Sequence, residues 1–379
     1  MQNTSTVSPF SGNEKISRVL QFALQTPSSE NCQPWKFVVH RNIVEVFHLS
    51  ERAKLSTFSD NFSVFGLGMV AESLNLACST EGLQARITYF LEKRSDKSPW
   101  LRVELSPADT LPDPLARGIF LRHTDRRRYA GGSLQDSVFK EAHNVAEAIS
   151  GANLYFTCNY PEEYLQLLRN ADQLVMTWPE LRHDIMKWTR FTDKEAAETR
   201  DGMGWRSYLR GPENWVYYLR SRIWWLATRL NWFPAWLQRF ETLFFDDSAE
   251  LSPLTYDDGA GIGCVTTASD APKDLVSSGR LAMRLWLLFN LSGYGFQPIT
   301  NLSGMIYRLR TGAFILPVSL RHFVANGYEI LQGLFGFPLQ ELPMFTFRTG
   351  LATGEYPDNS RQLRRTDHIC YTNGDHEHL

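Results

Sequence analysis

The sequence predicts an α+β protein in which helices alternate with separate strands that form mixed or antiparallel sheets. Long stretches carry apolar residues at helical spacing, and short runs of β-branched and aromatic residues stand between them. With 43% hydrophobic and 21% charged residues the composition is globular, which excludes a disordered, collagen-like or disulfide-stapled chain. The length of 379 residues suggests two domains or one large fused unit.

The first part of the chain predicts two helices and three strands. Apolar residues at helical spacing mark a helix at 14–26, which ends at a proline followed by two serines. The other predicted elements are strands at 35–39, at 43–47 and near 86–91, and a buried helix at 63–80 that ends near Gly82. The polar, proline-rich stretch 95–114 is the predicted boundary between two halves.

The second part predicts a further set of elements. These are a helix at 135–149, a strand at 153–157, a mostly helical region at 161–246, a buried strand at 262–267, a long helix at 273–292 that stops at Gly293, and a late strand at 345–348. The tail beyond about Arg365 is predicted to be frayed.

Charge and cysteine content exclude several classes of protein. The 39 Lys and Arg residues against 41 Asp and Glu residues give a net charge of -2, so nothing draws the chain to nucleic acid. The five cysteines are scattered and form no CxxC pair, which disfavours a zinc module or a disulfide framework. The first residues carry no secretory signal, and no stretch of about 18 uncharged apolar residues predicts a spanning helix. We therefore expect a reduced, cytoplasmic protein.

The standard motifs for nucleotides and metals are missing or misplaced. The alternating glycines of 258–263 stand before a predicted strand, whereas a dinucleotide fingerprint follows a strand and opens a helix. We expect a loop that enters a strand there. The acidic pairs 246–247 and 257–258 have no spaced set of ligands around them, so we expect no metal site.

Two short blocks carry chemical information. The block Pro27–Trp35 (PSSENCQPW) offers hydroxyls and amides in a turn between a helix and a strand, and an amide can read the edge of a planar heterocycle. The block Arg122–Arg126 (RHTDR) offers two guanidiniums and a hydroxyl, which suit a phosphate. Taken separately, the first could be an ordinary loop and the second a solvated basic loop.

Together the two blocks resemble the FMN-dependent nitroreductase superfamily. Its members carry a PSSxNxQPW turn after the first helix and an Arg-x-Ser/Thr-x-Arg motif before that helix, and in family dimers the two pieces come from different subunits. This chain has the turn at 27–35 without a preceding arginine motif, and RHTDR at 122–126 without a following turn. The resemblance therefore implies two nitroreductase-like halves, 1–115 and 116–379, fused around one composite FMN site.

The resemblance also implies which residues hold the cofactor. The phosphate would be held by Arg122, Thr124, Arg126, Arg365 and Arg364, and the flavin would be contacted by Pro27, Ser28, Ser29 and Asn31. His123 would tune the flavin or serve as a hydrogen-bonding or surface residue, while Pro298 and Ile299 lie in a segment that resembles the loop beside the isoalloxazine. No protein acid or nucleophile is required, because the flavin carries the hydride chemistry.

An aromatic insert at about 161–250 sets this chain apart, since eight of its 11 Trp lie between Trp178 and Trp236. Three interpretations stay open: a helical packing layer, a lid over the flavin, and a peripheral membrane contact through 214–245, where Trp and Phe alternate with Arg. Residues 187–190 and 201–202 resemble the dormancy-associated subgroup of the superfamily, whose fused members have such a cover.

The resemblance implies an FMN-dependent oxidoreductase that moves electrons between NAD(P)H and a small organic molecule such as a nitroaromatic or a quinone. Two alternatives stay open: a biosynthetic oxidase or dehydrogenase in which the substrate replaces the nicotinamide, and a catalytically silent protein that sequesters flavin beneath a lid. We expect a monomer or a weak homodimer, because the fusion would supply the family's dimer within one chain.

Overall fold

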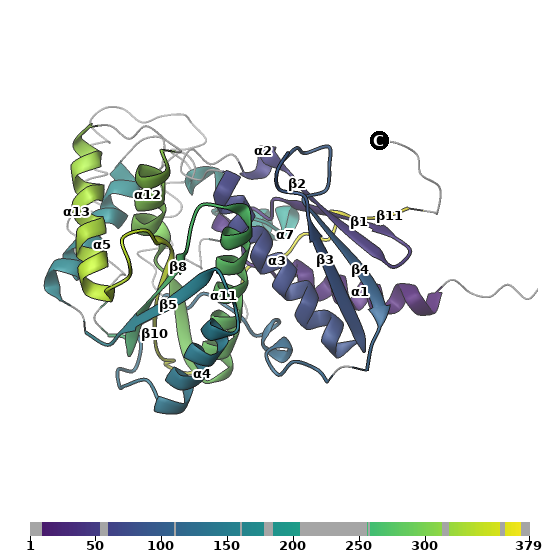
Figure 1. Cartoon of the computed structure of the whole chain (residues 1–379), viewed down its shortest axis with the longest axis horizontal. Coiled ribbons are helices and arrows are strands. Elements are labelled where there is room, and N and C mark those ends of the chain that lie inside the picture. Colours follow the sequence, from purple (N-terminus) through teal and green to yellow (C-terminus); the bar gives the residue numbers. More distant parts are fainter. Residues whose placement is uncertain are drawn as a thin grey trace, which may run out of the picture.

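The computed structural model describes residues 10–53, 60–109, 111–159, 161–177, 185–204, 256, 258–312, 318–356 and 361–372. Two sheets lie on either side of a central pair of long helices (Figure 1). Helices pack on both sheets, and most neighbouring strands in these sheets are antiparallel. The predicted α+β class is therefore confirmed.

The first sheet has the strand order β11-β1-β2-β4-β3. The elements of this half are α1 (Phe10–Leu24), β1 (Trp35–His40), β2 (Ile43–His48), α2 (Ser50–Ala53), α3 (Asp60–Thr80), β3 (Leu83–Tyr89) and β4 (Leu101–Pro107). Strands β3 and β4 alternate between more and less buried residues, as expected of strands with one face toward the core. Helices α1 and α3 pack together and supply that core.

The second sheet has the order β5-β8-β10-β9 and is covered on both faces (Figure 1). Its elements are α4 (Asp136–Glu147), β5 (Ala152–Thr157), β8 (Gly261–Thr267), α11 (Pro272–Leu291), β9 (Tyr294–Pro298) and β10 (Leu342–Leu351), with α5 (Glu162–Thr177), α12 (Thr300–Thr311) and α13 (Val318–Phe335) beyond. In β8, Val265 packs with α4 and α11, whereas Ile262 and Cys264 pack with α5, α12 and α13. Burial on both faces explains why every residue of β8 is buried.

Helices α3 and α11 approach each other at two glycines. A Cβ atom on Gly68 would lie 2.2 Å from the carbonyl oxygen of Val276, and one on Gly279 would lie 2.0 Å from that of Phe65. The fully buried Glu72 of α3 is neutralised by Arg280 and Arg284 of α11, at 2.7 and 2.6 Å. Close backbone contact and buried ion pairs therefore join the two halves along this helix pair.

The two halves share one topology. Each runs helix, strand, strand, long helix, strand, strand: α1-β1-β2-α3-β3-β4 in the first, and α4-β5-β8-α11-β9-β10 in the second when the additional elements are set aside. In each, the fourth of these strands lies between the second and third, and all neighbours are antiparallel. This likeness supports the prediction of two related halves at 1–115 and 116–379, which stays a prediction.

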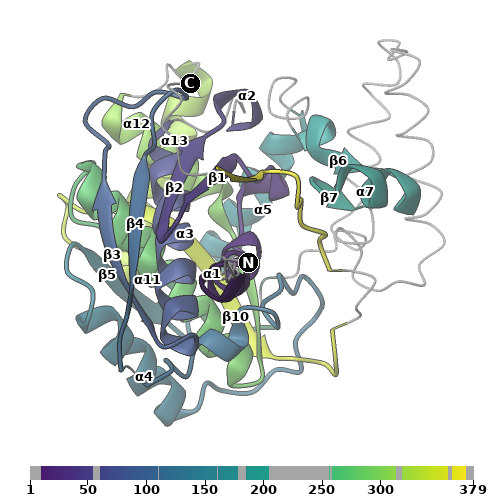
Figure 2. The same cartoon turned by 90° about the vertical axis from the view of Figure 1, so that its right-hand side faces the viewer.

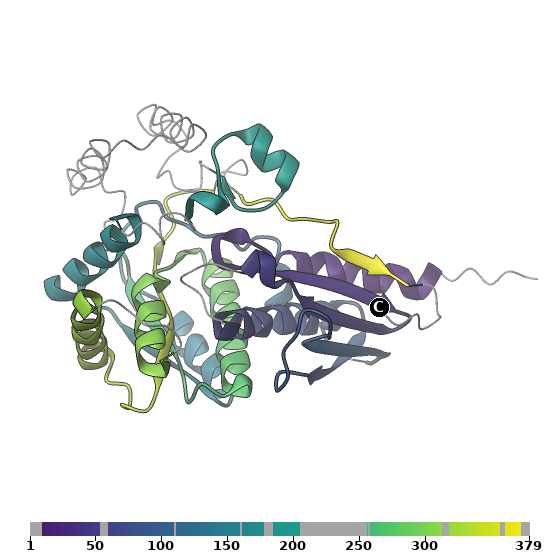
Figure 3. The same ribbon diagram turned by 90° about the horizontal axis from the view of Figure 1, so that it is seen from above.

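Two expectations about local structure were wrong, and one strand was not expected. That strand is β4, which lies inside the stretch 95–114 and whose apolar residues alternate with charged and polar ones. The stretch itself stays the predicted boundary between the two halves. The segment expected to form a loop before Ile299 is strand β9. The tail is not frayed throughout, since β11 (Ile369–Tyr371) pairs parallel to β1 (Figure 3). The pairing partners of these segments lie far away in the sequence, which is why the local pattern missed them.

The insert is described only in part. Its described elements are α5, β6 (Thr189–Arg190), α7 (Asp193–Thr199) and β7 (Met203–Gly204), and β6, β7 and α7 lie beside the C-terminal segment (Figure 2). The region 214–245, on which the membrane interpretation rests, lies outside the described residues. Among the helices that the structure describes, Asn61–Thr80 is long and apolar enough to cross a membrane, but 72% of that window is buried inside the protein.

Candidate functional site

The turn between α1 and β1 has an unusual backbone. Glu30, Asn31 and Gln33 have φ angles of 46°, 54° and 48°, a left-handed conformation that few residues other than glycine adopt. The Ser28 hydroxyl accepts a hydrogen bond from the backbone N–H of Gln33 at 2.9 Å and closes the turn. A conformation of this kind persists where its surroundings determine it, so the contacts of the turn matter.

The amide of Asn31 is fully used by the protein itself. Its Nδ2 donates to the carbonyl oxygens of Gly202 at 2.9 Å and Leu363 at 3.0 Å, and its Oδ1 accepts from Nη1 of Arg364. The backbone N–H of Gly202 donates in turn to the carbonyl of Asn31 at 3.1 Å. Asn31 is 1% exposed, so it ties together the turn, the insert and the C-terminal segment.

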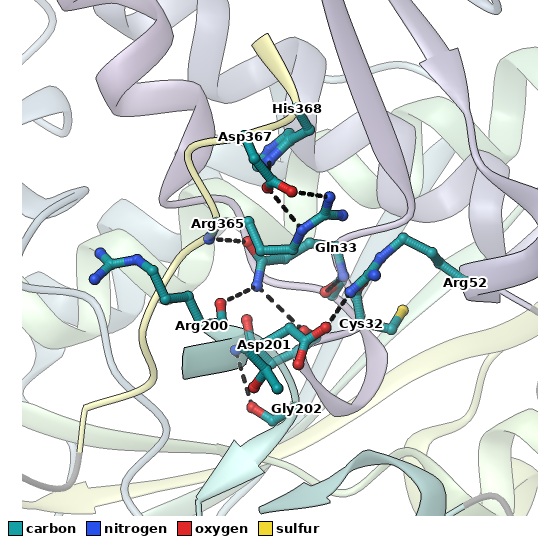
Figure 4. A network of polar contacts seen from close by, with 12 residues as sticks. Cys32, Gln33, Arg52, Arg200, Asp201, Gly202, Arg365, Asp367 and His368 are labelled. Carbon is teal, nitrogen blue, oxygen red and sulfur yellow. Dashed lines mark hydrogen bonds and ion pairs between the residues drawn. The ribbon is translucent and has the colours of Figure 1, made fainter. Parts of the chain in front are cut away.

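Gln33 makes the same three-way connection. Its Nε2 donates to the carbonyl oxygen of Arg200 at 3.0 Å, and its Oε1 accepts from the backbone N–H of Arg365 at 2.8 Å. Figure 4 shows these contacts converging where the turn, the insert and the C-terminal segment meet. The sequence placed an amide here but gave no sign of its partners, which lie about 170 and 330 residues away.

A buried carboxylate anchors the insert to this turn. Asp201, 8% exposed, is bound by Arg190 at 2.6 Å and also by Arg52, which donates through its Nε to the carbonyl of Cys32 at 2.8 Å. Burial acts to raise the pKa of Asp201, but hydrogen bonds from Arg52 and Arg190 hold it below the usual value. The ring of Trp188 lies under Arg52, 5.1 Å from its guanidinium carbon.

Arg122 and Arg364 are buried cations, and within the described residues neither has a carboxylate within ion-pair distance. Arg122, 9% exposed, donates to the carbonyl of Gln25 at 3.1 Å and lies 4.5 Å above the Trp286 ring. Arg364, 7% exposed, donates to Asn31. The Nε atom of each is buried without a hydrogen-bond partner.

Within the described residues these two arginines lack a counter-ion, and an anion bound beside them would be stabilised. Burial, followed by repulsion from Arg364, lowers the pKa of the Arg122 guanidinium well below its ordinary value. Burial lowers the pKa of Arg364 to about 10. Because guanidiniums stay protonated at neutral pH, both groups remain as buried positive charges, and a bound phosphate would satisfy them through charge-assisted hydrogen bonds.

The other residues of the Arg122–Arg126 block divide between several roles. Thr124 is partly exposed. His123 stacks on Tyr356 with ring centroids 4.1 Å apart, and burial lowers its pKa. Arg126 reaches toward the insert, where its Nη2 lies 3.7 Å from the sulfur of Met203. The block therefore contacts both the second half and the insert.

Several predicted residues lie elsewhere or have other partners. Arg365 is paired with Asp367 at 2.9 Å, whereas no described carboxylate lies within ion-pair distance of Arg364. Ile299 is buried in the core formed by α5, α12 and α13, and Pro298 ends β9. In the turn, Pro27 is buried and Ser29 is exposed.

A second polar cluster was not predicted at all. Asp172 of α5 accepts hydrogen bonds from the Tyr256 hydroxyl and from Nδ2 of Asn301, the latter at 2.8 Å. Burial raises the pKa of Asp172 to about 6, although both hydrogen bonds act to lower it. No pattern around Asp172 marks it in the sequence, because its partners come from other elements.

Fold and geometry thus define an α+β protein with two buried arginines near the junction of the Asn31 turn, an insert and the C-terminal segment. No family model matches the chain. Over 119 residues it is 29% identical to the Mycobacterium tuberculosis protein named "Putative NAD(P)H nitroreductase acg", a match found for two strains. This match confirms the resemblance to the nitroreductase superfamily. It covers 30% of this chain and 36% of the relative, so the matched part spans about a third of the relative's length.

Solved structures of nitroreductases are also similar to parts of the chain. A nitroreductase with bound FMN from Desulfitobacterium hafniense is 12% identical, covering 69% of this chain and 99% of its own, with a TM-score of 0.38. The FMN-dependent nitroreductase NfnB from Mycobacterium smegmatis, in complex with NADPH, is 11% identical, covering 62% of this chain and 86% of its own, with a TM-score of 0.31.

Proposed function

We propose that this chain is an FMN-dependent oxidoreductase that holds one FMN in a site shared by its two halves and passes electrons between NAD(P)H and a small organic molecule. The observation that carries the proposal is the pair of buried guanidiniums of Arg122 and Arg364 beside the Asn31 turn, for which the described part of the chain supplies no carboxylate at ion-pair distance. Arg122 comes from the start of the second half, the turn from the first half and Arg364 from the C-terminal segment.

The residues present fit the phosphate of FMN. The two buried Nε atoms without a partner are N–H donors, and a phosphate provides the oxygen acceptors and the negative charge that both arginines lack. Arg122 and Arg364 would hold that phosphate, and the partly exposed Thr124 could add a hydroxyl. Asn31 would shape the site rather than contact the flavin, since its amide already has three protein partners.

The chemistry of the site would come from the cofactor, because FMN accepts and donates hydride when it is bound. The chain's own residues bind and orient. Their positive charge favours a dianionic phosphate, and the segment 200–202 covers the Asn31 turn. No catalytic acid or nucleophile of the protein is part of the proposal.

The first test is the visible absorption spectrum of the purified protein, with chromatography of the cofactor released on denaturation. We expect FMN at one molecule per chain. Arg122→Met and Arg364→Met should lose it, whereas Arg18→Met should keep it, because Arg18 is an exposed arginine paired with Glu81. A colourless protein that also takes up no added FMN would refute the proposal, as would full occupancy in both site variants.

Stopped-flow reduction of the bound cofactor would then identify the electron donor. Rapid bleaching by NADPH or NADH supports the reductase. Bleaching by neither would favour the alternatives, a substrate-driven oxidase or a flavin-sequestering protein. The hydrogen bonds between Arg200–Gly202 of the insert and the Asn31 turn are the observation that favours sequestration. Fast bleaching of the wild-type protein, in which these contacts are intact, excludes sequestration.

A further inference from the structure

The segment Arg200–Gly202 of the insert contacts both the Asn31 turn and the C-terminal segment that carries Arg364. Its Gly202 exchanges hydrogen bonds with Asn31 in both directions. The carbonyl oxygen of its Arg200 accepts a hydrogen bond from Gln33 (Figure 4). The Nε atom of Arg200 donates to the carbonyl oxygen of Arg364 at 2.8 Å. One short segment thus contacts the turn of the first half and the residue that carries a buried cation of the site.

This segment has a backbone that needs an anchor. Arg200 and Gly202 have φ angles of 52° and 69°, both in the left-handed region. A Cβ atom on Gly202 would lie 2.4 Å from the carbonyl oxygen of Trp188 and 2.9 Å from the guanidinium carbon of Arg190, so glycine alone fits there. The segment therefore lies against β6, and only a strong local tie would keep it in this conformation.

Asp201 supplies that tie. One of its carboxylate oxygens binds two nitrogens of Arg190, at 2.6 and 3.1 Å, and the other binds Arg52. Arg52 also donates to the carbonyl of Cys32 within the Asn31 turn. The carboxylate consequently fixes the segment to the insert on one side and to the first half on the other, in a region where all three side chains are largely removed from water.

We propose that Asp201 is a positioning residue of the cofactor site: by anchoring Arg200–Gly202 it holds Arg364 and Asn31 in the arrangement that binds the anion. This inference rests on the proposed function, because it takes the phosphate of FMN as that anion. Asp201 itself touches no ligand in this account. It acts through Arg200 on the backbone of Arg364, and through Gly202 on Asn31, which accepts from the Arg364 guanidinium.

The test is the dissociation constant of FMN, measured by fluorescence titration of apoprotein. Asp201→Asn should weaken FMN binding by about tenfold or more, the usual size of coupling within a hydrogen-bonded network. Glu45→Gln is the matched control, because Glu45 of β2 is a similarly shielded carboxylate and is paired with Arg102 of β4 instead of with the insert. This variant should bind FMN as the wild type does. Arg200 is exposed, so Arg200→Met keeps the fold even if Asp201→Asn does not, and it should weaken binding by about threefold or more.

Two further measurements separate positioning from a general loss of stability. Arg200→Lys keeps a donor and should recover most of the affinity that Arg200→Met loses, while the melting temperature of the apoprotein stays the same in both. In an Asp201→Asn background the effect of Arg200→Met should shrink, because Asp201 is proposed to act in part through Arg200.

The outcomes distinguish the two proposals. If wild-type apoprotein binds FMN and Arg200→Met binds it equally well, the positioning role is wrong and the proposed function stands. The role is also wrong if the losses from Asp201→Asn and Arg200→Met add in full. A wild-type protein that binds no FMN overturns the proposed function and this inference together.

Discussion

Replacing Arg364 by methionine should abolish the stabilisation of this protein by phosphate without weakening its fold. The side chain is 7% exposed, and burial lowers its pKa from its ordinary value to about 10. A lowered pKa in a base means that the folded state disfavours the charged form, so the cost is present in full at every pH below about 10. A shift of this size corresponds to about 3 kcal/mol of stability lost to the buried charge.

The substitution has an opposing effect that the structure also shows. Methionine cannot donate to Oδ1 of Asn31, and leaving that buried oxygen without a partner costs about 1–3 kcal/mol. The two effects nearly cancel, so the free energy of unfolding of the apoprotein should stay the same or rise by about 2 kcal/mol at most, as when other buried charges are replaced by apolar side chains.

The assay is urea unfolding of apoprotein in phosphate and in chloride at equal ionic strength. Wild-type protein should gain about 2.7 kcal/mol when phosphate is a hundredfold above its dissociation constant, and Arg364→Met should gain nothing. Arg18→Met, which removes an exposed arginine, should respond as the wild type does. The reasoning fails if the Arg364 variant is strongly destabilised in chloride, or if phosphate stabilises it as much as it stabilises the wild type.

Four other substitutions test the fold and its titrating groups. Gly279→Ala should destabilise the fold by at least about 2 kcal/mol in urea, because its Cβ would meet backbone of α3; Gly333→Ala, in an open stretch of α13, should instead stabilise it by about 0.5–1 kcal/mol. With a folded pKa of about 6, Asp172 makes the wild type lose stability as pH rises from about 4 to about 6, by at most about 3 kcal/mol. Asp172→Asn should abolish that slope in urea unfolding, and an unchanged slope would mean that another group titrates. Burial lowers the pKa of His368 to about 4, so the wild type should lose stability as pH falls from about 6.5 to about 4. His368→Phe should show a smaller loss in thermal unfolding over this range, and equal losses in the two proteins would contradict this assignment.

The regular elements were largely determined by local sequence. The helical stripe before Pro27 became α1, the apolar runs became β1, β2 and β8, and the long helix that stops at Gly293 became α11. These patterns follow from the periods of helix and strand, which a sequence displays directly. Local sequence patterns did not predict four elements, because packing and pairing with distant segments decided them. These are helices α12 and α13 and strands β4 and β11.

The candidate site was found only in part. The Pro27–Trp35 and Arg122–Arg126 blocks pointed to an anion and a flavin, and the structure ties the first block, through Asn31, to the buried Arg364. The sequence offered both Arg364 and Arg365, and the structure pairs Arg365 with Asp367. Which of two adjacent arginines is left without a counter-ion depends on neighbours in space, so a single sequence does not reveal it.

The sequence by itself determined the type of the main elements, the resemblance to nitroreductases and the two blocks of polar residues. Only the tertiary structure decided that Asn31 binds protein instead of standing free, that Arg122 and Arg364 are buried together, and that Asp201 joins the insert to the Asn31 turn through Arg52. The physical reason is the same in each case. Burial and charge compensation are properties of a surrounding volume, to which residues separated by up to 333 positions contribute.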